Sequence, residues 1–143
     1  MTETLKREEH WGRCELLVLS SLLFLTPLAF TDWQHRLSIC LALLSVVTAF
    51  NSVMLWADPQ NVAKWKIDKL TARVSAFIYT CVGVSVMSMT FFLNVGVPTW
   101  IGMGASYLTS RKLDRKHDPK WIYAHGIFHA MVAIGMCEVM INC

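Results

Sequence analysis

Two histidines in the C-terminal part of the sequence are the residues best placed to do chemistry. His125 and His129 are four positions apart, so in a helix they share one face with Cβ atoms about 5–6 Å apart. Two imidazoles at this spacing can bind one metal ion, as they do in helical zinc sites. The pair can equally be hydrogen-bonded core residues or interfacial groups at a membrane edge, and the spacing alone leaves both interpretations open.

Ser52 and Asp68 are the other polar residues that interrupt or border apolar stretches. A carboxylate can bind a metal or accept a proton from metal-bound water, and a serine can hydrogen-bond that water or a substrate oxyanion. Each residue also has a structural interpretation. Asp68 would complement the dipole of a helix that it opens, and Ser52 would pack helices together in a membrane.

The composition indicates a membrane protein. Of 143 residues, 55% are hydrophobic and 16% are charged, whereas a soluble domain has about 25% charged residues. This composition excludes a disordered chain, a coiled coil and a nucleic-acid-binding domain. The formal net charge of +3 is too small to suggest a polyanionic partner. We expect residues 1–143 to form a single integral membrane domain.

The few charges divide the sequence into apolar segments of about membrane-spanning length. Residues 74–110 are uncharged, which is too long for one span of about 20 residues and about right for two. Asn94 to Pro98 contains glycine and proline and is the predicted break. The fourth span then covers only about 21 Å, which leaves open an earlier start, an off-centre position or a thinner bilayer. The sequence predicts an all-α polytopic bundle of five spans, at residues 14–31, 36–57, 69–93, 97–110 and 120–141.

The basic residues predict the orientation of these spans. All 13 lysines and arginines except Arg36 fall on one side of the predicted bundle, in the N-terminal segment (Lys6, Arg7, Arg13), near 64–73 and in 111–120. The positive-inside rule places that side in the cytoplasm, with the C-terminus opposite. His125, His129, Ser52 and Asp68 then fall in the same leaflet, and we expect them to converge on one polar pocket.

The order of these residues resembles a known superfamily. Ser52-x-x-x-Trp56, then Asp68, then His125-Gly126-Ile127-Phe128-His129 is similar to the pattern of the alkaline ceramidases, the progestin and adiponectin receptors and the myomaker-like proteins. Those are seven-helix membrane proteins in which three histidines bind zinc, an aspartate and a serine support a zinc-bound water, and characterised members cleave amide bonds in ceramide-like lipids. This sequence departs from the pattern in its five spans and in Trp56, which stands where the family has its first zinc histidine.

The resemblance implies a metal-dependent hydrolase that acts on a lipid amide or ester in the cytoplasmic leaflet. His125 and His129 would bind Zn²⁺, Asp68 would be a ligand or general base, and Ser52 would orient the reacting groups. The alternative is a non-catalytic integral membrane protein, either a degenerate family member or an accessory subunit of a larger membrane complex, and Trp56 favours this alternative. Membrane lipids, a homo-oligomer or a larger complex are the expected partners. A channel or transporter is disfavoured because no span carries a polar stripe along its length.

Overall fold

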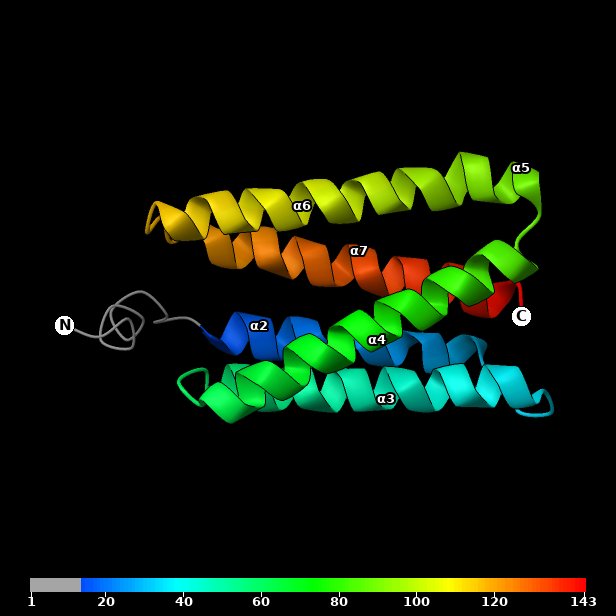
Figure 1. Ribbon diagram of the computed structural model, residues 1–143, viewed down its shortest axis with the longest axis horizontal. Helices are drawn as coiled ribbons and strands as arrows, with labels where there is room; N and C mark the ends of the chain where they lie inside the picture. Colours follow the sequence, from blue (N-terminus) through cyan, green and yellow to red (C-terminus); the bar gives the residue numbers. More distant parts are fainter. Residues whose placement is uncertain (1–13) are drawn as a thin grey trace.

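The computed structural model describes residues 14–143, which form helices and contain no strand (Figure 1). Five antiparallel segments follow one another, and this confirms the predicted all-α class. They are α2 with η1 (Cys14–Ser21, Leu22–Phe30), α3 (Arg36–Ala57), α4 (Val62–Val86), α5 with η2 and α6 (Met89–Phe91, Phe92–Gly96, Val97–Arg115), and α7 (Trp121–Ile141). Helices α6 and α7 lie side by side along one half of the bundle, α2 and α3 along the other, and α4 crosses them diagonally.

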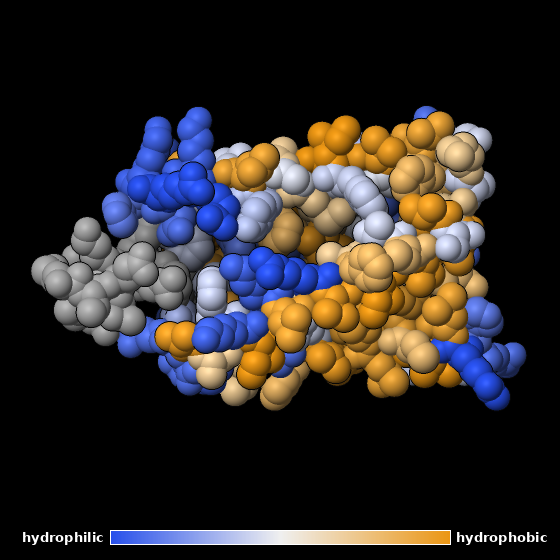
Figure 2. Space-filling model, viewed as in Figure 1, coloured by the Kyte–Doolittle hydropathy of each residue, from blue (hydrophilic) through white to orange (hydrophobic). Residues whose placement is uncertain are grey.

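The surface of the bundle is unusually apolar. Large hydrophobic side chains are exposed along every long helix, for example Leu43, Phe77 and Ile101. Figure 2 shows a broad hydrophobic zone, with hydrophilic side chains gathered at the end where α6 finishes and a smaller group at the opposite end. Soluble monomers rarely expose so large an apolar area. Helices α3 and α7 are long and apolar enough to cross a membrane, and Glu15–Phe30 is a shorter apolar helical segment.

The first segment reaches membrane-spanning length by changing its helical winding. Its first half is α-helical, and Leu22–Phe30 is a 3₁₀-helix with Pro27 inside it. The 3₁₀ winding rises about 2.0 Å per residue against 1.5 Å for an α-helix. Seventeen residues therefore extend about 30 Å, close to the thickness of a bilayer core.

The break in the long uncharged stretch lies earlier than the sequence predicts. Helix α4 ends at Val86, and Ser88 caps the next helical segment by accepting a hydrogen bond from the Phe91 N–H. The prediction of a break at Asn94–Pro98, with spans at 69–93 and 97–110, is therefore wrong. A π-helical turn at Phe92–Gly96 precedes Pro98. Such turns accommodate local disruption of the α-helical hydrogen-bond ladder, so the helix continues through the proline.

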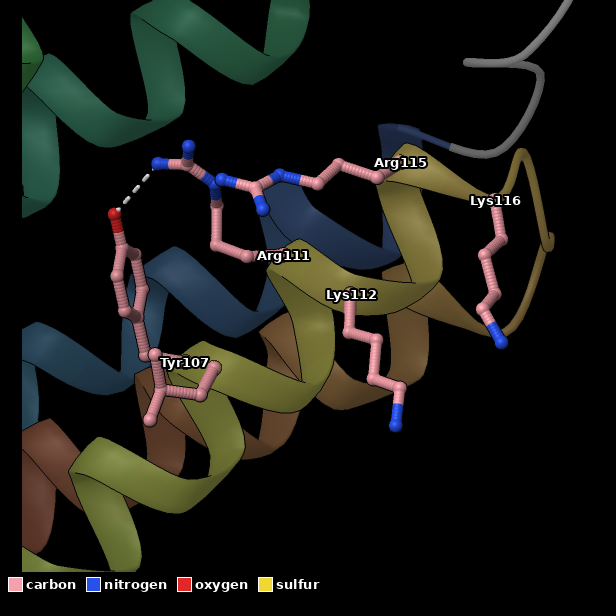
Figure 3. A pocket seen from close by; sticks show the side chains of 6 residues that line it. Tyr107, Arg111, Lys112, Arg115 and Lys116 are labelled. Atoms are coloured by element: carbon pink, nitrogen blue, oxygen red, sulfur yellow. Dashed lines mark hydrogen bonds between the residues drawn. The ribbon is translucent and has the colours of Figure 1, made fainter.

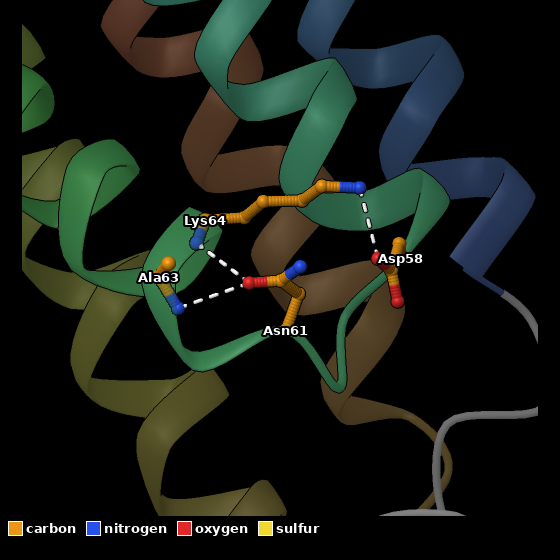
Figure 4. Close-up of polar contacts among 4 residues, drawn as sticks. All are labelled: Asp58, Asn61, Ala63 and Lys64. Atoms are coloured by element: carbon orange, nitrogen blue, oxygen red, sulfur yellow. Dashed lines mark hydrogen bonds and ion pairs between the residues drawn. The ribbon is translucent and has the colours of Figure 1, made fainter.

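The connection between α3 and α4 fixes where α4 begins (Figure 4). The Asn61 side chain accepts hydrogen bonds from the N–H groups of Ala63 and Lys64, at 3.0 and 3.2 Å, and so caps the helix. Lys64 Nζ lies 2.9 Å from Asp58 Oδ2. The Lys64 ammonium group lowers the pKa of the Asp58 carboxyl. These contacts hold α4 against the end of α3.

Hydroxyl and amide groups join α3 to α4 through the middle of the bundle. Ser45 lies 2.6 Å from the Tyr79 hydroxyl, Thr48 lies 2.7 Å from Ser75, and Asn51 donates to Thr71 at 2.8 Å. From one pair to the next, the position moves forward by three residues along α3 and back by four along α4, as expected for antiparallel helices. All three pairs therefore lie on one contact line. Within an apolar interior, hydrogen bonds between helices hold the helices in one register.

Replacing Tyr79 by phenylalanine tests this contact line. Tyr79→Phe removes the hydroxyl that also donates to the Leu41 carbonyl at 2.9 Å. We expect it to lower the free energy of unfolding by about 1 kcal/mol, measured by detergent titration of purified protein. The matched control is Ser85→Ala, whose hydroxyl bonds only the Cys81 carbonyl of its own helix. Equal stability of both variants would contradict the assignment.

Candidate functional site

The two histidines lie together inside the end of the bundle where α7 begins. Because α7 starts at Trp121, His125 is one turn and His129 two turns into the helix. Their ring centroids are 4.8 Å apart, and the planes meet at 68°. His129 is only 3% exposed, whereas His125 is half-buried. The predicted shared face is thus present, and neighbouring helices determine what it contacts.

A serine of α2 contacts the ring of His129. Ser20 Oγ lies 2.8 Å from His129 Nδ1 and 3.1 Å from the Leu17 carbonyl oxygen of its own helix. The contact between Ser20 and His129 is a hydrogen bond that joins α2 to α7.

A serine of α6 contacts the ring of His125. Ser110 Oγ lies 3.2 Å from His125 Nδ1 and 3.4 Å from the Trp121 carbonyl oxygen. The bonds of the two histidines tie α7 to α2 on one side and to α6 on the other.

Trp56 of α3 packs against both imidazoles. Its ring centroid is 5.2 Å from that of His125 and 6.5 Å from that of His129. The indole also lies 6.1 Å from Trp121, and it is 8% exposed. Trp56, which stands where the resembled family has a histidine, therefore lies beside His125 and His129, which match that family's other two histidines.

Ser52 lies one turn before Trp56 and faces α2. Its Oγ is 2.9 Å from Ser21 Oγ, and Ser21 donates its proton to the Leu17 carbonyl at 2.7 Å. The hydroxyl predicted to orient a water or a substrate is thus used to join α3 to α2.

Asp68 lies further into α4 than the sequence predicts. Helix α4 begins at Val62, so Asp68 is about two turns inside it and does not open it. The interpretation of Asp68 as a dipole-complementing residue is wrong, because that effect falls off within the first turn. The ring of His129 bonds to Ser20 and the ring of His125 bonds to Ser110, and Asp68 takes part in neither bond.

The described residues do not supply the ligand set of a catalytic zinc ion. Such an ion has three protein ligands and an open position for water. Within residues 14–143, no three His, Cys, Asp or Glu side chains gather so that they could hold a metal. Two imidazoles are present, and the Trp56 indole packs against them. The pair alone does not fit the zinc site that the resemblance implies.

Comparisons with known proteins add no assignment. No family model matches this chain, and neither a curated protein nor a solved structure matches it. The interpretation of the site therefore depends on its own geometry.

Sequence reasoning missed the residues that hold the histidines, Ser20 and Ser110. Each adjoins a second hydroxyl residue, Ser21 or Thr109, so the sequence does not show which hydroxyl makes an interhelical bond. Their partners depend on how α2 and α6 rotate about their axes, which no local pattern specifies.

Ser20→Ala tests whether the bond to Ser20 fixes the tautomer of His129. Without Ser20 Oγ, His129 Nδ1 loses its hydrogen-bond partner, so we expect a change in the ¹⁵N shifts of the His129 ring and a loss of about 1 kcal/mol in stability. Nuclear magnetic resonance of histidine-labelled protein in detergent measures the shifts.

The matched control for this experiment is Ser106→Ala. Its hydroxyl bonds only carbonyls of its own helix, at Gly102 and Met103. Unchanged His129 shifts in Ser20→Ala would show that the assigned bond does not fix the tautomer.

Proposed function

We propose that this protein is a multi-pass membrane protein whose buried histidines join helices and do not form a hydrolytic centre. The observation that carries the proposal is the Trp56 indole packed on both imidazoles, 5.2 and 6.5 Å away. Nδ1 of each histidine is also hydrogen-bonded to a serine of another helix. The cluster therefore has the contacts of a packing centre that links α2, α3, α6 and α7.

The distribution of polar groups supports a membrane setting for all five segments. The start of α4, with Lys64, Lys66 and Lys69, and the connection between α6 and α7, with Lys116 and Lys120, lie at one end of the bundle, and both are basic. Arg36 lies at the opposite end, beyond the exposed apolar zone. We place the basic end in the cytoplasm by the positive-inside rule. Lys6, Arg7 and Arg13, which also contribute to the predicted orientation, lie outside the described residues.

Labelling single cysteines from either side of the membrane tests this topology. In a cysteine-free variant, Ser88→Cys and Lys116→Cys should react with an impermeant thiol reagent from opposite sides of a sealed vesicle. Ser88 sits between α4 and α5, and Lys116 follows α6. A cysteine at Asn94, inside the π-helical turn, should be protected. Reaction at position 94 in place of 88 would contradict the observed break.

A zinc-dependent hydrolase of lipid amides or esters is the second candidate. It is favoured by the two imidazoles that lie together on α7 with their ring centroids 4.8 Å apart, since two histidines four residues apart on a helix can bind one metal ion. It would require a third ligand beyond those gathered in residues 14–143. The proposed packing role requires none, and for that reason we rank it first. As a packing subunit, the protein would associate with a second copy or with other membrane chains.

Zinc content distinguishes the two candidates. We expect wild-type protein purified in detergent to carry far less than one zinc per chain by elemental mass spectrometry. Trp56→His should bring this close to one, because three imidazoles match the ligand number of catalytic zinc sites. Trp56→Phe is the matched control, and Trp56→His combined with His129→Ala should lose the metal again.

One outcome would contradict the packing role, and another would contradict the ligand position that the resemblance assigns to Trp56. About one zinc per wild-type chain, lost in His125→Ala/His129→Ala, would favour the hydrolase and justify a screen of lipid amides. A folded Trp56→His variant that stays free of metal would show that Trp56 does not stand in a ligand's place. Thermal melting of each variant establishes that it is folded.

A further inference from the structure

The last turns of α6 carry two parallel rows of side chains that change from apolar to basic. One row is Tyr107, Arg111 and Arg115, and the other is Leu108, Lys112 and Lys116. Members of each row are four residues apart, so they lie above one another on the helix surface. The six side chains line a surface hollow of about 440 Å³ (Figure 3).

Four cations surround this hollow, and none of its lining residues is acidic. Figure 3 shows the two arginine side chains extending to one side of the helix and the two lysine side chains to the other. Arg111 Nη1 donates to the Tyr107 hydroxyl at 3.0 Å, which holds one guanidinium group in place. A cationic hollow of this kind attracts an anion that has several acceptor oxygens.

The hollow adjoins exposed apolar side chains, which favours a ligand that also has an apolar part. Leu108 is 67% exposed and Tyr107 is 38% exposed, and both lie toward the exposed apolar zone of the bundle. The basic start of α4 at the same end is different in kind. There Lys64 pairs with Asp58, and Lys69 lies over the Trp65 ring at 4.4 Å.

We propose that this hollow binds the phosphate headgroup of an anionic phospholipid. The guanidinium groups of Arg111 and Arg115 would take the phosphate oxygens, because a planar fork of donors matches that geometry. Lys112 and Lys116 add positive charge at the opposite edge. The first part of the acyl chains would lie along Leu108 and Tyr107. The ligand is thus a lipid of the leaflet at this end of the bundle, held at a defined site.

Lipid titration of the purified full chain tests the site, with native mass spectrometry as the readout. Phosphatidylglycerol, whose only charge is its phosphate, is compared with phosphatidylcholine, which is zwitterionic. We expect preferential retention of phosphatidylglycerol, weakened about 25-fold in Arg111→Gln/Arg115→Gln. Lys66→Gln/Lys69→Gln removes the same charge from α4 and should change the binding less than twofold.

A charge-preserving variant separates a defined site from diffuse attraction. Arg111→Lys/Arg115→Lys keeps the charge and loses the forked donors, so we expect binding to weaken several-fold. Equal weakening by the α4 variant, or no change in the lysine variant, would overturn the proposal in favour of general surface attraction. Glycerol phosphate added as a competitor should displace little lipid. Displacement at comparable concentration would identify free phosphate as the ligand and would also overturn it.

Discussion

The apolar interior of this bundle leaves its buried hydroxyl and imidazole groups with other protein groups as their partners. Helix α2 shows how the fold meets this constraint, because the Ser20 and Ser21 hydroxyls both lie within hydrogen-bond distance of the Leu17 carbonyl. Ser20 also bonds to His129, and Ser21 also bonds to Ser52. One turn of α2 thereby makes hydrogen bonds to both α7 and α3. The contact line between α3 and α4 meets the same constraint with other hydroxyl pairs.

A helix-packing centre and a hydrolytic centre make opposite demands on this position in the bundle. Hydrolysis needs an open coordination site, a water and a path for substrate, whereas packing needs the space to be filled. Trp56 fills it with the largest side chain available, against His125 and His129. The serines that bond to the histidines also join α7 to α2 and α6, as the packing role that we propose requires.

Some features of the structure could be predicted from the sequence, and others could not. The apolar segments between clusters of charge predicted helices, and the spacing of His125 and His129 predicted that they share a helix face. Both features follow from local periodicity, and the structure has both. The break at Asn94–Pro98 was wrong because a π-helical turn let the helix continue through Pro98, an adjustment with no local sequence rule. The bonds from Ser20 and Ser110 depend on helix rotation, which is set by contacts distant in sequence. Asp68 was misplaced because the Asn61 cap starts α4 at Val62, whereas the sequence predicted a span that begins at residue 69.

The 3₁₀ winding of Leu22–Phe30 also changes which side chains share a face. With three residues per turn, every third side chain eclipses the one before it. Burial follows this period, since Ser21, Phe24 and Pro27 are buried and the residues between them are not. The buried stripe runs straight along the axis, whereas on an α-helix it would drift around the surface. A helical wheel drawn at 100° per residue would instead spread these three positions over an arc of about 120°. Sequence variation in relatives of this protein would accordingly show a period of three over this stretch.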